Sequence, residues 1–190
     1  MKRNDPIGKY FTLEEFCTCS NTYRKNADRI DPYPKNPDSI EALRDLARYL
    51  LDPIVEYFGK ERFTLTYGFC SVDLKRFLAR KDPETGLKNG RVDPSRDQHL
   101  ANEIDAKGRY YCSRLGASCD FHIKDLSSDA LVDWILDRDL PFDSLYYYGR
   151  ERSIHLSHGP QQKRDIWTFT PAGTPTRKGI EKWRERTRSH

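Results

Sequence analysis

The longest amphipathic pattern in the chain runs from residue 38 to residue 59. Apolar side chains recur there at helical spacing, at Ile40, Leu43, Ala47, Leu50, Leu51, Ile54 and Phe58. This spacing predicts a helix with one apolar face, capped by Asp38 or Ser39 and ended by Gly59. Pro53 lies inside the pattern. Because proline lacks a backbone N–H, we expect a kink there, or a separate last turn.

Shorter patterns predict two further helices and a series of strands. The opening FTLEEFCTCS predicts a helix with Thr12 as its N-cap and Glu15 as the capping-box partner. A second helix begins at Ser127 or Ser128 and ends before Pro141. Residues 63–69 are rich in aromatic and β-branched residues, which are typical of strands, and further strands are expected at residues 118–123, 144–149, 153–158 and 165–170.

The order of these elements, with helices first and strands later, predicts an α+β fold. We expect N-terminal helices packed on a small, mostly antiparallel sheet. Residues 75–114 are polar and have no convincing period, which is typical of a functional loop or lid. We expect one domain over residues 1–175 and a basic C-terminal tail over residues 176–190. The tail is typical of a solvated, frayed helix, or of a segment that contacts phosphate groups of nucleic acid.

Composition narrows the class of protein. The chain has 190 residues, of which 36% are hydrophobic and 33% charged, and its net charge is +4. It is long enough for one folded domain and makes no strong electrostatic demand for nucleic acid. MKRNDPIGKYF lacks the apolar segment of a secretory signal, and no stretch approaches the length of a membrane span. We therefore predict a cytoplasmic protein with no membrane partner, whose five cysteines are reduced thiols.

Histidines and one aspartate supply the candidate chemistry. His99, His122, His155 and His158 lie in the later half of the chain. A catalytic zinc ion takes three protein ligands, commonly histidine and carboxylate, and keeps a fourth position for water. Asp120 and His155 fall in predicted strands, where side chains alternate between the two faces. Periodicity does not bring these residues together by itself, and each histidine alone is also typical of a surface or hydrogen-bonded position.

Several motifs, in the same order, resemble the phage-type M15 family of D-Ala-D-Ala carboxypeptidase-like metallopeptidases, which have a hedgehog-type zinc fold. FTLEEF, the helix ending LLDPIVEYFG and the segment TYGFCS resemble the N-terminal half of that family. DQH at 97–99 resembles its S-x-H motif, GASCD at 116–120 its G-x-A-x-D motif, and SIHLS at 153–157 its W-V-H-V-S strand. The resemblance runs from about Phe11 to Ser157. It implies that His99, Asp120 and His155 bind one zinc ion.

The chain departs from the family pattern at three places. In the family, the histidine and aspartate of the middle motif are seven residues apart, whereas here an insertion over residues 101–115 separates them. The family arginine that stabilises the oxyanion falls on Cys70, and the glutamate that serves as general base falls on Tyr148. Glu151 is the substitute we expect for the base. Tyr148 remains a possible hydrogen-bond donor to an oxyanion.

The resemblance implies a zinc-dependent hydrolase that cuts an amide bond in a small peptide. Its natural candidate substrates are peptidoglycan peptides that end in D-amino acids. Without a visible signal peptide, such an enzyme would act as a phage endolysin or on a different substrate. A third reading is a changed hydrolysis, in which Glu151 and the insertion build a new pocket.

The alternative from another class is a zinc-binding module that kept the fold and lost the peptidase chemistry. Such a module would bind nucleic acid, through the basic tail and the tyrosines of residues 146–148, or a protein partner. A carboxylate beside the open zinc position favours the hydrolase, and its absence favours the module.

Overall fold

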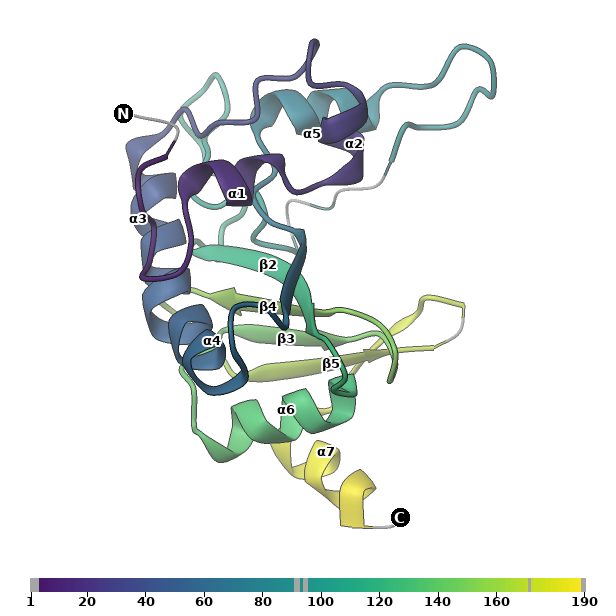
Figure 1. The fold of residues 1–190 in the computed structure, drawn as a ribbon. Helices are drawn as coiled ribbons and strands as arrows, with labels where there is room; N and C mark the ends of the chain where they lie inside the picture. The colour runs from purple at the N-terminus through teal and green to yellow at the C-terminus, as the bar shows by residue number, and fades with distance from the viewer. Residues whose placement is uncertain (1–3, 91–92, 94–95, 171, 189–190) are drawn as a thin grey trace.

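A mixed β-sheet organises the described part of the computed structural model, which covers residues 4–90, 93, 96–170 and 172–188 (Figure 1). The strand order is β1-β2-β4-β3-β5-β6. The strands are β1 (Phe63–Tyr67), β2 (Ala117–Ile123), β3 (Ser144–Tyr147), β4 (Ile154–His158), β5 (Asp165–Phe169) and β6 (Pro175–Arg177). All neighbouring strands are antiparallel except β3 and β5, which are parallel. The expected α+β class and mostly antiparallel sheet are confirmed.

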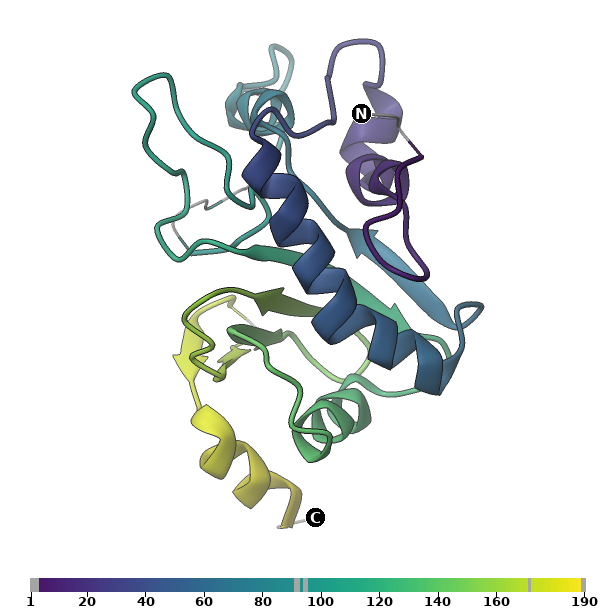
Figure 2. The same cartoon turned by 90° about the vertical axis from the view of Figure 1, so that its left-hand side faces the viewer.

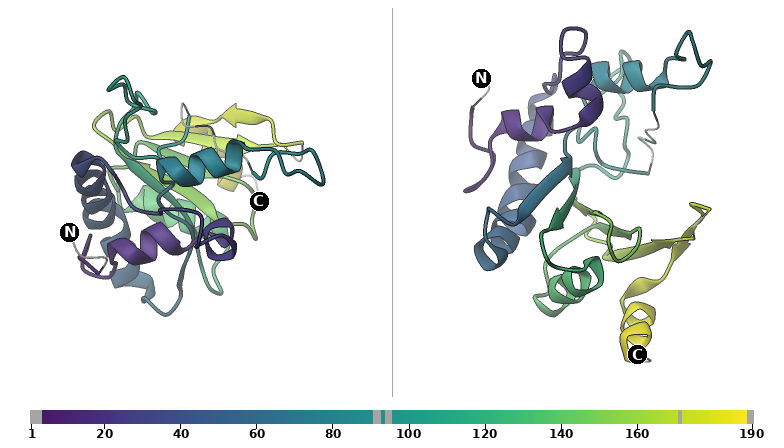
Figure 3. Two further views of the ribbon diagram at one scale, coloured as in Figure 1. Left: turned by 90° about the horizontal axis from the view of Figure 1, so that it is seen from above. Right: turned by 45° about the vertical axis from the view of Figure 1, so that its right-hand side comes forward.

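Helices surround the sheet. They are α1 (Leu13–Thr18), α2 (Asn21–Lys25), α3 (Pro37–Leu46), the π-helical turn η1 (Ala47–Leu51), α4 (Asp52–Phe58), α5 (Val72–Ala79), α6 (Ser128–Asp137) and α7 (Gly179–Arg188). Two views agree that α1, α2 and α5 gather at one end of the molecule and that α6 and α7 lie at the other (Figures 1 and 3). The predicted capping box of Thr12 and Glu15 is present at the start of α1. Ser127 caps α6 as expected.

The long predicted helix is interrupted by a widened turn. Helix α3 begins two residues earlier than expected, because the side chain of Asn36 caps it and Pro37 occupies the first helical position. Before Pro53 the backbone adopts the π-helical turn η1, in which the N–H of Asp52 bonds to the carbonyl of Ala47. Proline has no backbone N–H to donate, and the wider π-turn accommodates the missing hydrogen bond. Gly59, with a φ of 91°, ends α4 as predicted.

Alternation along the strands separates an apolar face from a polar one. In β2 the residues Cys119 and Phe121 are fully buried in the main core, whereas Asp120 and His122, which alternate with them, are only half-buried. Leu145 of β3 and Leu156 of β4 join the same core. The rod formed by α3, η1 and α4 crosses this apolar face of the sheet (Figure 2). The opposite face is left free to carry polar chemistry.

Two parts of the chain differ from the sequence-based expectation. Residues from 75 onward were expected to be irregular, yet α5 extends to Ala79, with Ser71 as its N-cap and the buried Leu74 and Leu78 on one side. Over the described residues of 80–116, only isolated β-bridges interrupt the irregular backbone. The long polar loop is therefore present but begins later than predicted.

The C-terminal segment is packed against the domain rather than extended as a free tail. Thr176 and Arg177 belong to β6, and the following residues form α7. Trp183 is only 1% exposed, and its indole N–H donates to Asp133 at 2.7 Å. Trp183 anchors this highly charged helix, because burial of its large apolar ring stabilises the packed helix relative to a frayed one. Residues 189–190 of the predicted tail lie outside the described residues. Within the described chain, no helix is both long and apolar enough to cross a membrane.

Candidate metal centre

One line of cross-strand neighbours runs over the polar face of the sheet. Asp120 on β2 pairs with His155 on β4, and His155 pairs with Tyr146 on β3. At the two ends of this line, Tyr67 of β1 pairs with Asp120, and Trp167 of β5 pairs with Tyr146. Directly opposite residues in a sheet project to the same face. Register therefore places the aspartate, the histidine and three aromatic side chains on one surface.

A bulge in β1 brings Tyr67 onto this surface. Phe63 and Leu65 pair with Ile123 and Phe121 on the core face, but the register then shifts, so that Tyr67 meets Asp120. Without the shift, Tyr67 would follow Leu65 to the core face, because strand side chains alternate. The bulge is a local device that adds an aromatic residue to the polar face.

His99 reaches the same place from the long loop. Its backbone carbonyl accepts a hydrogen bond from the N–H of Cys70 at 2.8 Å, and its ring packs edge-on against Tyr67 with centroids 4.7 Å apart. The ring Nδ1 lies 2.9 Å from the carbonyl oxygen of Gly68. A carbonyl can only accept, so Nδ1 carries the proton in the neutral ring. That hydrogen bond directs the lone pair of Nε2 away from Gly68, toward Asp120.

The three side chains form a compact ligand set. His99 Nε2 lies 3.3 Å from Asp120 Oδ1 and 3.2 Å from His155 Nδ1, and Asp120 Oδ1 lies 2.8 Å from His155 Nδ1. A tetrahedral zinc site with bonds of about 2.0 Å has ligand–ligand edges of about 3.3 Å. The set His99, Asp120 and His155 therefore fits a metal ion with small adjustments. No cysteine takes part, since all five are buried free thiols elsewhere.

Charges within the ligand set are strongly coupled. Burial lowers the pKa of His99, but the attraction and hydrogen bond of Asp120 outweigh it and raise that pKa to about 9. Burial also opposes ionisation of Asp120, yet the attraction of His99 and the hydrogen bonds from both histidines hold the pKa of this carboxyl well below its usual range. Burial keeps the pKa of His155 below its ordinary value. An ionised aspartate between two histidines matches the ligands of a divalent cation, which would have to displace the proton of His99 to bind.

His155 is oriented by stacking and not by an outer hydrogen bond. Its ring lies parallel to that of Tyr146, with centroids 4.5 Å apart and an interplanar angle of 17°. Nε2 is buried and has no hydrogen-bond partner within the described chain. Metal-ligating histidines usually donate their second N–H to an outer partner, as His99 does. For His155, stacking on the face of Tyr146 holds the ring in place of such a hydrogen bond.

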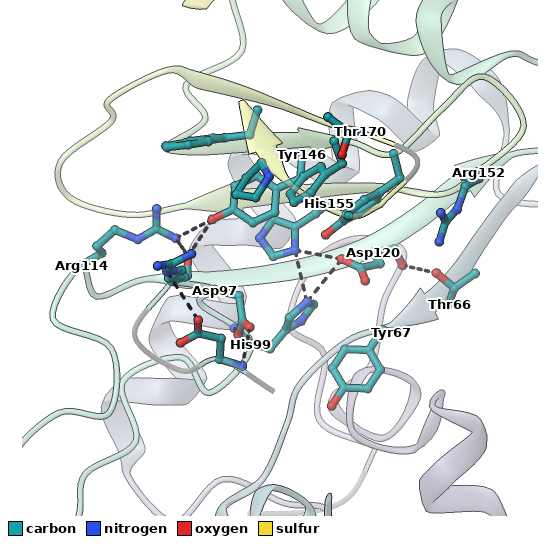
Figure 4. Close-up of a pocket in the computed structure, with 17 residues that line it drawn as sticks. Thr66, Tyr67, Asp97, His99, Arg114, Asp120, Tyr146, Arg152, His155 and Thr170 are labelled. Atoms are coloured by element: carbon teal, nitrogen blue, oxygen red, sulfur yellow. Dashed lines mark hydrogen bonds and ion pairs between the residues drawn. The ribbon is translucent and has the colours of Figure 1, made fainter. Parts of the chain in front are cut away.

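The ligand set lies in the wall of a pocket of about 1220 Å³ (Figure 4). Thr66, Thr170, Gly173 and Pro175 line part of the rest, and the other lining residues are aromatic residues, arginines and aspartates. They are Tyr67, Tyr146, Tyr148, Trp167, Phe169, Arg96, Arg114, Arg152, Asp93 and Asp97. Asp120 is the most open of the three ligands, with 26% of its side chain exposed against 7% for His99 and 1% for His155. A ligand atom in this pocket can therefore approach the metal position.

Of the two residues predicted to assist catalysis, Tyr148 lines the pocket and Glu151 does not. Tyr148 lines the pocket, and burial together with the nearby charge of Asp120 raises the pKa of its hydroxyl. Glu151, expected to fold back over the metal, instead has 85% of its side chain exposed and pairs with Arg150 at 3.7 Å. It is not among the residues that line the pocket. In the turn between β3 and β4, the neighbouring Arg150 pairs with Asp129 at 2.7 Å, and its carbonyl accepts a hydrogen bond from the N–H of Ser128 at 2.9 Å.

Sequence reasoning missed several residues of this pocket. Trp167 and Phe169 lie at alternating positions of β5, opposite the alternating Tyr146 and Tyr148, and only the parallel pairing of β3 with β5 shows this. Asp97 lies two residues before His99 in the DQH motif, and the resemblance assigns no role to its carboxylate. Alternation was the available signal for the aromatic residues. No signal in the sequence pointed to the pairing itself.

Comparison of the chain with family models, with curated proteins and with solved structures finds no match. The resemblance to M15 peptidases therefore stays a prediction that rests on the motifs. The arrangement of His99, Asp120 and His155 is an independent observation that rests on the geometry.

Proposed function

We propose that the chain is a zinc-dependent hydrolase that cleaves an amide bond in a small peptide, in the manner that its M15-like motifs imply. The observation that carries the proposal is the ligand set of His99, Asp120 and His155, placed in the wall of an open pocket. Zinc bound by three protein ligands lowers the pKa of water in its open position and polarises a substrate carbonyl. Peptidoglycan peptides ending in D-amino acids are the first substrates to test.

The protein groups of the pocket have distinct tasks in this proposal. Tyr148 keeps its proton at neutral pH, because its pKa is raised by burial, and it donates a hydrogen bond to the developing oxyanion. We assign the proton-accepting role to Asp97 in place of Glu151. Asp97 lines the pocket, and its two carboxylate oxygens accept from the backbone N–H groups of His99 at 3.4 Å and Asp93 at 3.2 Å. A carboxylate held in this way is positioned rather than free to turn.

The alternative is a zinc-binding module without hydrolytic activity. The exposed position of Glu151 favours it, because the expected substitute for the family base is absent from the pocket. Asp97 argues against it, since the pocket still contains a carboxylate outside the ligand set. The two readings share the metal and differ only in turnover.

The deciding experiment measures the metal content of the purified protein beside the variants His155→Ala and Asp120→Ala. About one zinc ion per chain, lost in both variants, establishes the site. The loaded protein is then incubated with short peptides that end in D-amino acids, and released amines are quantified. Zinc binding with no cleavage of any peptide supports the module. A wild-type protein that takes up no metal, even with zinc supplied, contradicts both readings.

A further inference from the structure

Arg114 brings a partly buried guanidinium to the pocket. It comes from the end of the insertion, and its guanidinium is held by Nη2, which donates to the carbonyl of Arg96 and to the hydroxyl of Tyr146, the latter at 3.3 Å. Among the described residues, Asp143 attracts the charge of Arg114 without forming an ion pair with it, and the buried Nε has no hydrogen-bond partner there. Arginines that are partly buried normally meet an anion. In the described part of the chain, no carboxylate forms an ion pair with Arg114.

Tyr146 connects this charge to the metal centre. Its hydroxyl contacts Arg114, donates to the carbonyl of Arg96 at 2.7 Å, and its ring stacks on His155. The guanidinium thus contacts the hydroxyl of Tyr146, and the ligand His155 lies against the face of the same ring (Figure 4). A small molecule lying along that ring would reach both.

An aromatic platform borders the same space. It consists of Tyr146, Tyr148, Trp167 and Phe169, which all line the pocket. Phe169 contacts Tyr148 at a centroid distance of 4.7 Å and the edge of Tyr146 at 5.7 Å, and Trp167 pairs with Tyr146 in the sheet. Flat rings stack on such surfaces, and apolar groups are desolvated there.

The charge balance of the pocket also favours an anion. Three arginines and three aspartates line it, namely Arg96, Arg114, Arg152, Asp93, Asp97 and Asp120. Arg96 already pairs with Asp93 at 3.5 Å, and Arg152 lies over the ring of Tyr148. A divalent cation bound by Asp120 would leave the pocket with a net positive charge, which attracts anionic ligands.

We propose that the pocket is built for a small substrate that carries an anionic group, bound by Arg114, next to a ring that stacks on the aromatic platform. The proposal rests on the proposed function and deepens it by naming the substrate class. A carboxylate and a phosphate would both satisfy Arg114, because each accepts paired hydrogen bonds from a guanidinium. The insertion thereby acquires a role, since it supplies the specificity-determining residue.

The test measures ligand binding by calorimetry on zinc-loaded protein, with zinc content determined for every sample. The probes are N-acetyl-D-phenylalanine, its amide, N-acetyl-D-alanine and phenyl phosphate. They present ring and carboxylate, ring alone, carboxylate alone, and ring and phosphate. Arg114→Gln removes the charge, and Arg114→Lys keeps it without the planar fork. Arg109→Gln is the matched control, because Arg109 lies on the same insertion but pairs with Asp105 at 2.7 Å and does not line the pocket.

We expect wild type to bind N-acetyl-D-phenylalanine at least about tenfold more tightly than its amide, since hydrogen bonds to a charged group are the strong ones. The alanine probe should also bind more weakly than the phenylalanine probe. Arg114→Gln should abolish the advantage of acid over amide, Arg114→Lys should keep part of it, and Arg109→Gln should keep all of it. The stronger of the carboxylate and phosphate probes identifies the natural anion.

Two results overturn the inference: equal binding of acid and amide by the wild type, or an undiminished preference in Arg114→Gln. Failure of the proposed function gives a different pattern. A protein that binds no zinc, yet prefers the acid through Arg114, contradicts the hydrolase and leaves the anion subsite standing. A protein that binds zinc without any preference between the probes does the reverse.

Discussion

Asp120 and His155 stand directly opposite each other on the antiparallel strands β2 and β4, with Oδ1 and Nδ1 separated by 2.8 Å. The sheet register fixes this pair, so two of the three ligands are positioned by backbone hydrogen bonds that do not depend on the metal. His99 is added by a loop that is tied to Gly68 and Cys70. Such a site is largely formed before the metal binds.

Removal of the metal should therefore lower stability without unfolding the domain. The large core formed by α3, η1, α4 and the sheet lies on the other face and does not include the ligands. At free zinc about a thousand times Kd, the gain is about 4 kcal/mol. For a domain of this size, the melting temperature should rise by roughly 8–16 °C. Thermal unfolding with zinc and with a chelator measures this, and Asp120→Ala should show no difference between the two.

The carbonyl of Gly68 should be needed for tight metal binding. A Cβ at this position would lie 2.4 Å from the backbone oxygen of Phe16, so the Gly68→Ala backbone must move and carry the His99 acceptor with it. Loss of such an outer hydrogen bond costs about 10–100-fold in metal affinity. Zinc titration against a competing chelator measures it. Gly86→Ala, where an added Cβ meets nothing within 4 Å, should leave the affinity unchanged.

The sequence predicts Asp120 and His155 on strands because each lies in a short run in which apolar and polar residues alternate, SCDFHI and SIHLSH. It did not predict that they are opposite each other, because register depends on contacts between segments far apart in the chain. The bulge that turns Tyr67 toward Asp120 leaves no local mark in FTLTYGF. The helical periodicity of residues 38–59 therefore predicts the helical segment correctly, whereas nothing local in the sequence predicts the pairing of the strands.

The outward course of Glu151 has a similar cause. Spacing placed it four residues before His155, but the direction of a turn is decided by contacts such as that of Arg150 with Asp129 at 2.7 Å. Arg114 was equally invisible, since it comes from an irregular loop whose path is set by side-chain hydrogen bonds to Arg96 and Tyr146. Periodicity carries no information about either contact.

The thiol of Cys19 should make stability fall at alkaline pH. Burial raises its pKa from 9.0 to about 11, against a hydrogen bond from the Gly68 N–H that lowers it. A raised pKa means that the thiol contributes its full stability below about pH 9. Between pH 9 and 11 the unfolded chain ionises first, and stability falls by up to about 1.4 kcal/mol per pH unit.

Urea unfolding of the wild type and of Cys19→Ser, from pH 8 to pH 11, tests this. The serine hydroxyl does not ionise in this range and can still accept from Gly68. The free energy of unfolding of the variant should therefore fall less steeply with pH than that of the wild type. Parallel curves for the two proteins would exclude a contribution from this thiol.

Trp183 should stabilise the whole domain, although it lies in a segment whose sequence is typical of a free tail. Its side chain is 1% exposed and its ring contacts Tyr147 edge-on, with centroids 4.9 Å apart. Trp183→Ala should lower the free energy of unfolding by about 3–5 kcal/mol. Metal content should not change. The exposed neighbour Lys182 is the control, and Lys182→Ala should change stability by less than about 0.5 kcal/mol. If the two variants are equally stable, Trp183 does not anchor the helix and the segment behaves as a free tail.

Substitutions of Asp97 and of Glu151 distinguish which carboxylate is the general base of the proposed hydrolysis. If Asp97 accepts the proton, Asp97→Asn should lower kcat by about 10²–10⁴-fold on any peptide that the wild type cleaves, whereas Glu151→Gln should leave kcat unchanged. The single asparagine oxygen can still accept one of the two backbone N–H groups, that of His99 or that of Asp93. No metal ligand is altered, so both variants should retain about one zinc per chain. This separates lost chemistry from a lost metal. A large loss in Glu151→Gln together with normal kcat in Asp97→Asn would require the β3–β4 turn to close over the pocket when substrate binds. That result would return the base to the residue that spacing alone first suggested.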